Sequence, residues 1–130
     1  MIENLVNFEA EQSVIGSIIL DNSVYDRVAF LSADDFYSPA HKEMFRKAKE
    51  CIGNEGKSLD MIEMDARCNP DVVSYSYIAE VSNNTPSAAN AVAYADRVMD
   101  MSNRRRAHIA MTEAMELWIV TGKLLRCKNN

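Results

Sequence analysis

The feature that most constrains this chain is a stretch from about Ala88 to Val120 that contains neither glycine nor proline. Both residue types interrupt helices, so their absence over some 30 residues predicts one long helix. At 1.5 Å per residue such a helix is about 45 Å long, whereas a compact chain of this size has a radius of gyration near ~14 Å. We therefore expect the end of this helix to project from the rest of the protein.

The apolar pattern along this stretch changes face near its middle. Two stripes recur at helical spacing, and at about 100° per residue they lie about 180° apart. The first half can therefore bury one side on its own domain while the second half offers a different side to another copy of the chain. The alternative is that the helix breaks near Ser102 and folds back, with both stripes in one core. The first stripe is Ala91, Ala95 and Val98, and the second is Ala107, Met111, Ala114 and Trp118.

Shorter helical segments precede the long one and are separated by breaks that contain Gly, Pro, Asn or Ser. Ser38-Pro39 has the form of an N-cap followed by proline at the first helical position. Asp60 with Glu63 resembles a capping box, and Gly16 marks a close approach between helices. We expect these helices over about residues 9–20, 24–31, 39–52 (ended by Gly53), 61–68 and 72–81.

The predicted fold class is therefore all-α: a compact globule of about five short helices, followed by a long C-terminal helix. We assign residues 7–101 to the globule and residues 102–121 to a projecting half of the long helix, which we call the arm. Gly122 is interpreted as a helix stop. Residues 122–130 then form a tail, for which disorder is one alternative.

Composition and charge argue against several classes of function. The formal net charge is −5, whereas a domain that grips a phosphate backbone is usually basic, so we expect weak or no direct binding of nucleic acid. No apolar run approaches the roughly 18 residues of a membrane span, and the first residues lack a basic secretion signal. We therefore expect a cytoplasmic protein without membrane contact. Three widely spaced cysteines, Cys51, Cys68 and Cys127, indicate free thiols rather than a zinc site.

No catalytic, metal or cofactor-binding constellation is apparent. His41 lies on a helical face and is interpreted as a structural residue, and His108 as a surface one. Gly122-Lys123 lacks both the earlier glycine and the following Ser or Thr of a phosphate-binding loop. Asp34 and Asp35 suit the first turn of a helix. The chain by itself is thus expected to be no enzyme and to bind no cofactor.

The remaining candidates for function are interaction residues on the long helix. Arg104, Arg105 and Arg106 are consecutive, so on a helix they spread over about 200° and cannot form one flat patch. Salt bridges or solvation is one interpretation, and a phosphate or inter-subunit contact is the other. Beyond them, the sequence predicts an interaction surface centred on three large side chains of the arm. These are Met111, Met115 and Trp118.

Four segments together resemble the N-terminal domain of DnaB-type replicative DNA helicases. Residues 8–16 read FEAEQSVIG and residues 18–22 read IILDN, similar to the EAEQ-x-VLG and LLLDN of that family. Residues 34–41, DDFYSPAH, and residues 84–90, NTPSAAN, followed by AYA at 93–95, match its DFY-x-PAH and NTPSAAN…AYA segments. The resemblance covers about residues 7–106.

The resemblance implies an all-α globule followed by a helical hairpin, of which the long helix forms all or part. It implies that hairpins pair between subunits into a ring collar of a hexamer, so the chain itself is one partner. Primase and the helicase loader are the other partners that the resemblance implies. ATP and Mg²⁺ are expected only in a RecA-like motor domain, which this sequence lacks.

The sequence departs from the family after Val120, where TGKLLRCKNN does not resemble the second helix of the hairpin. Two functions therefore stand beside each other. The first is the assembly and docking domain of a hexameric replicative helicase in the primosome. The alternative is a stand-alone phage or prophage adaptor or inhibitor that mimics the helicase collar and binds primase, loader or helicase subunits.

Overall fold

The computed structural model describes residues 2–129, and every regular element among them is helical. Five short α-helices precede one long helix, which confirms the predicted fold class. The α-helices are α1 (Phe8–Leu20), α2 (Val24–Val28), α3 (Pro39–Ala48), α4 (Met61–Arg67), α5 (Tyr75–Asn83) and α6 (Ala91–Asn129). Two 3-10 helices, η1 (Ile2–Leu5) and η2 (Ala33–Asp35), and one π-helical segment, η3 (Lys49–Asn54), complete the order.

Local side-chain chemistry explains where most helices begin. The Ser38 hydroxyl accepts a hydrogen bond from the backbone N–H of His41, and Pro39 occupies the first turn of α3 as predicted. The Asp60 carboxylate accepts from the N–H of Glu63 at the start of α4. Each cap satisfies an N–H group that has no partner inside its helix.

Several predicted boundaries are wrong. The second helix ends at Val28 rather than Leu31, and the fifth runs Tyr75–Asn83 rather than from Val72 to Val81, because Ser74 caps it. Gly53 does not end the third helix, since the chain continues as the π-helical η3.

Gly122 is not a helix stop either, since α6 passes through it to Asn129. A single exposed glycine costs a helix only about 1 kcal/mol, and the Leu, Lys and Arg residues that follow are good helix formers.

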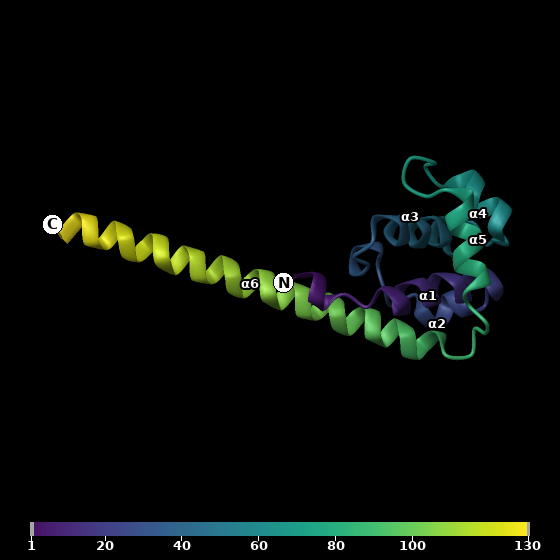
Figure 1. Cartoon of the computed structure of the whole chain (residues 1–130), viewed down its shortest axis with the longest axis horizontal. Helices are drawn as coiled ribbons and strands as arrows, with labels where there is room; N and C mark the ends of the chain where they lie inside the picture. Colours follow the sequence, from purple (N-terminus) through teal and green to yellow (C-terminus); the bar gives the residue numbers. More distant parts are fainter. Residues whose placement is uncertain (1, 130) are drawn as a thin grey trace.

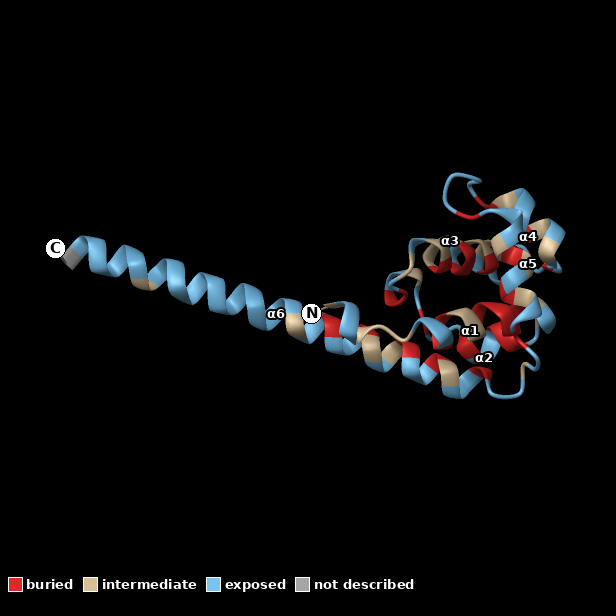
Figure 2. Ribbon diagram, viewed as in Figure 1, coloured by how far each residue is buried: buried red, intermediate tan, exposed pale blue. Residues whose placement is uncertain are grey.

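The core lies between α1 and the helices around it, where Figure 2 shows most of the buried residues. Helix α1 packs against α6, α5 and α3. Gly16 permits the closest approach: a Cβ there would lie 1.9 Å from Thr85 Oγ1 and 2.9 Å from the carbonyl oxygen of Val81. The close approach that the sequence predicts at Gly16 is therefore made by the end of α5 and by Thr85, which follows that helix.

Helix α6 is one continuous helix of 39 residues, about 58 Å long. Its first part lies against the globule, and the rest extends away from it (Figure 1). Arg105 is the last buried residue of α6, and after it only His108 and Gly122 are even half-buried among the side chains that the structure describes. The alternative in which the helix breaks near Ser102 and folds back is therefore wrong.

Candidate assembly and docking surface

The root of the arm is fixed by Asp35, which lies at the end of η2 and is 2% exposed. Its Oδ1 accepts hydrogen bonds from Ser102 Oγ at 2.7 Å and Arg106 Nη2 at 2.6 Å, and its Oδ2 accepts from the N–H of Ser32 at 2.8 Å. Burial alone would raise the pKa of this carboxyl. The hydrogen bonds from Ser32, Ser102 and Arg106 outweigh that effect and hold the pKa below its ordinary value. Asp35 thus joins α6 to the globule as a carboxylate.

Arg105 makes a second contact at the root. Its guanidinium donates to the backbone carbonyls of Leu5 at 2.8 Å and Asp35 at 2.7 Å, and it lies 5.7 Å from the centre of the Tyr37 ring. Only 8% of the residue is exposed. This side chain therefore ties the arm to η1, to η2 and to Tyr37, which follows η2.

The three arginines diverge around the helix. Arg104 is exposed and pairs along the helix with Asp100 at 3.1 Å, Arg105 points into the globule, and Arg106 pairs sideways with Asp35. Arg104 is thus the member of the cluster with the weakest tie to the globule.

The other interaction residues that the sequence predicts lie on the arm itself. Met111, Met115 and Trp118 are 66%, 58% and 73% exposed, and together with Ala114 they line one shallow apolar hollow. A helix that displays such large apolar side chains to water usually marks an interaction surface. Figure 2 shows the arm as exposed over most of its length.

Charge is divided between the two parts of the chain. Residues 1–101 contain 17 acidic and 8 basic side chains, a net of −9, whereas residues 102–130 contain 2 acidic and 6 basic ones, a net of +4; together these give −5. On α6, the exposed Asp96, Arg97, Asp100 and Arg104 precede the apolar stripe, and Lys123, Arg126 and Lys128 follow it. The end of the arm is thus basic, whereas the charges near the globule are balanced.

A buried polar network, which sequence reasoning missed, braces the globule. His41 is fully buried, with Nδ1 2.8 Å from Glu11 Oε1 and Nε2 2.6 Å from the Tyr77 hydroxyl. Glu11 also accepts from the N–H groups of Tyr37 and Ser38. Glu11 is adjacent in sequence to the apolar stripe of α1, and this position was the sequence signal for its burial.

The tautomer of His41 follows from its partners. A carboxylate can only accept, so Nδ1 carries a proton and donates to Glu11. Burial raises the pKa of Tyr77, which keeps its hydroxyl protonated and able to donate to Nε2. The network therefore links α1, α3 and α5 as a structural brace, in agreement with the structural interpretation of His41.

Among residues 2–129, no group of three or more His, Cys, Asp or Glu side chains is placed to hold a metal ion. Cys51 and Cys68 are buried, and burial raises the pKa of both thiols, that of Cys68 to about 11. Within the same part of the chain, no helix is both long enough and apolar enough to cross a membrane.

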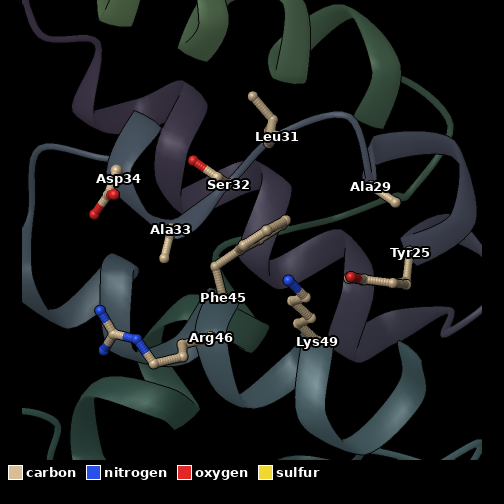
Figure 3. A pocket seen from close by; sticks show the side chains of 9 residues that line it. All are labelled: Tyr25, Ala29, Leu31, Ser32, Ala33, Asp34, Phe45, Arg46 and Lys49. Atoms are coloured by element: carbon tan, nitrogen blue, oxygen red, sulfur yellow. The ribbon is translucent and has the colours of Figure 1, made fainter. Parts of the chain in front are cut away.

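A hollow of about 330 Å³ lies between α3 and the segment that contains η2. Figure 3 shows Arg46 and Lys49 on the α3 side, with Ser32 and Asp34 opposite and Phe45 between them. Arg46 already pairs with Glu43. The hydroxyl of Ser32 donates to Asp35 Oδ2 at 3.4 Å, within its own turn.

The class that this fold defines is an all-α domain with a projecting helical arm. A family model described as "DnaB-like helicase N terminal domain" matches residues 3–100. The replicative DNA helicase DnaB of Pasteurella multocida is 38% identical over 100 residues, which is 72% of this chain and 21% of the relative. That of Haemophilus influenzae is 39% identical over 98 residues, 71% of this chain and 21% of the relative. The chain thus spans about a fifth of these relatives.

Two solved structures have the same fold as this chain. The crystal structure of the N-terminal domain of DnaB helicase from Mycobacterium tuberculosis superposes with a TM-score of 0.84 at 25% identity, covering 90% of this chain and 87% of that one. A DnaB-like replicative helicase, from a study of its interactions with primase, has the same fold, with a TM-score of 0.76 at 21% identity over 88% of this chain and 28% of that one. The chain belongs to the DnaB-like helicase N-terminal domain family.

Proposed function

We propose that the chain is the assembly and docking domain of a hexameric replicative DNA helicase and acts in the cytoplasm, in the primosome. The observation that carries this proposal is the uncovered apolar stripe on a projecting helical arm, in a chain whose fold is that of a helicase N-terminal domain. ATP and Mg²⁺ belong, in this proposal, to a motor domain outside these 130 residues.

The first partner that we propose is a second copy of the chain, bound through the arm. The face that carries Met111, Ala114 and Trp118 continues along the solvent side of the first half of α6, where Asp96 and Asp100 are exposed. A helix aligned antiparallel to this face, with the centre of pairing between Met111 and Ala114, covers the apolar stripe with its own copy.

Charge supports the antiparallel direction. The end of the arm is basic, with Lys123, Arg126 and Lys128, and the antiparallel pair places the two basic ends far apart, each beside a segment in which Asp96 and Asp100 balance Arg97 and Arg104. A parallel alignment would instead place the two basic ends side by side, and like charges at close range repel.

Primase and the helicase loader are the further partners that we propose. The support is the family resemblance, together with a structural neighbour whose title names interactions with primase. That neighbour is 21% identical to this chain, so it supports the fold, and the docking role stays a proposal.

The direction of self-association can be tested with the native cysteines. Cys127 is exposed on the arm, whereas Cys51 and Cys68 are buried, so a nitroxide reagent should label Cys127 selectively. In the antiparallel pair the two labels lie about 45 Å apart, from 1.5 Å per residue along the helix. In a parallel pair they lie near the interaxial distance of about 10 Å.

Dipolar electron spin resonance measures this separation. A single distance distribution near ~45 Å supports the proposal, and one near ~10 Å contradicts the antiparallel pair. The Cys127→Ser variant is the matched control, because it should remove the signal if labelling is confined to the arm.

A further inference from the structure

A hollow of about 380 Å³ lies at the elbow where α6 leaves the globule, and we call it the elbow pocket. Tyr37 and Lys42 line it from the globule, and Arg105, Arg106 and Ile109 line it from α6. Because its walls come from both parts of the chain, a molecule bound there would contact the globule and the arm at once.

Arg105 carries a positive charge that no carboxylate in residues 2–129 neutralises directly. Its two hydrogen bonds go to backbone carbonyls, and its third contact is the Tyr37 ring. A guanidinium has five N–H donors, so further donors remain. A buried charge whose partners are all neutral is stabilised by a nearby anion. The neighbouring Arg106 differs, since Asp35 pairs with it.

Lys42 adds a second cation to the pocket, and it too forms no ion pair within the described part of the chain. Asp34 is the acid among the residues that line the pocket, and Asp35 is already bound to Ser102 and Arg106. Ile109 and Tyr37 are 43% and 42% exposed, so the pocket also offers apolar surface to a ligand. Its chemistry therefore suits a carboxylate that lies beside an apolar group.

We propose that the elbow pocket binds a segment of a partner protein in which an acidic side chain is next to a large apolar one. The carboxylate reaches Lys42 and Arg105, and the apolar side chain covers Ile109 and Tyr37. A nucleic-acid strand carries a negative charge at every phosphate, so the net charge of −5 opposes its approach more strongly than that of a segment with a single carboxylate. Since α6 forms one wall, the bound segment holds the arm at one angle to the globule.

The test uses a short end-blocked peptide that alternates glutamate with leucine. It is titrated into the full chain carrying Met111→Ala and Trp118→Ala, which removes the proposed arm contact, so the result does not depend on self-association. Binding is followed by amide NMR shifts and by calorimetry. We expect saturable binding, with the largest shifts at Tyr37, Arg105 and Ile109.

Two variants localise the site. Lys42→Met should weaken binding about tenfold, equivalent to about 1.4 kcal/mol, and Ile109→Glu should abolish it. The matched control is Lys49→Met, because Lys49 also forms no ion pair and does not line the elbow pocket. Circular dichroism checks that each variant stays helical.

Three results would overturn the proposal. The first is equal binding of a peptide with glutamine in place of glutamate. The second is unchanged affinity in Lys42→Met, or no saturable shift at all. The third is competition by a short single-stranded oligonucleotide that binds more tightly than the peptide, which would assign the pocket to nucleic acid.

Discussion

Replacing Asp35 by alanine should destabilise the chain by about 1 to 4 kcal/mol. The carboxylate is the hydrogen-bond partner of Ser102 Oγ, which is buried, and an orphaned buried hydroxyl costs about 1 to 3 kcal/mol. The Ser32 N–H also loses its acceptor, but it lies in an exposed residue and can bind water. Arg106 is 56% exposed, so losing its ion pair adds only about 0 to 1 kcal/mol.

The assay is chemical denaturation followed by circular dichroism, with Asp34→Ala as the matched control. Asp34 is the adjacent acid, but it is exposed and forms no hydrogen bond or ion pair within residues 2–129. The control should therefore change the unfolding free energy by no more than about 0.5 kcal/mol. Equal stability of the two variants would refute the reasoning, because it would mean that the contacts of Asp35 do not hold the root of the arm.

Three further predictions follow from particular residues. Gly16→Ala should destabilise the fold by about 1 to 3 kcal/mol in the same assay, because its Cβ would collide with Thr85, whereas Gly122→Ala meets nothing within 4 Å and should stabilise the arm slightly. The pKa of Asp35 is lowered on folding, so its contribution to the unfolding free energy is complete above the ordinary pKa of about 3.9 and is lost as pH falls below that value. The Asp35→Asn variant should not show this acid-dependent loss of stability, and an acid-denaturation profile identical to that of the wild type would contradict the prediction. Single-stranded DNA should bind more weakly than about 1 µM at physiological salt, and tighter binding in fluorescence anisotropy would contradict this.

The helical class and many helix starts could be predicted because their causes are local. Ser38-Pro39 and Asp60 cap helices through groups within three residues of themselves, and the long helix follows from the absence of Gly and Pro between Ala88 and Val120. Gly122 shows the limit of this reasoning. A residue that ends many helices was tolerated inside this one, since nothing packs there to favour another conformation.

The contacts that build the site could not be predicted, because they join residues far apart in the sequence. Asp35 fits the first turn of a helix, yet its carboxylate also binds Ser102 and Arg106, 67 and 71 residues away. Glu11 and His41 each belong to a recognisable motif, but nothing in one motif shows that it contacts the other. The face switch on α6 was visible from periodicity alone, because it depends only on helical geometry.

The most direct test of the central claim is the mass of the chain in solution, measured by sedimentation equilibrium over a range of concentrations. If the arm is an assembly surface, the mass should rise from 14.6 kDa towards twice that value or more. Met111→Ala with Trp118→Ala should reduce association by about 2 kcal/mol or more and leave the melting temperature unchanged. Ile62→Ala is the control, since Ile62 is 71% exposed on the globule. A mass of 14.6 kDa at every concentration, or equal association of the double variant and wild type, would contradict the account.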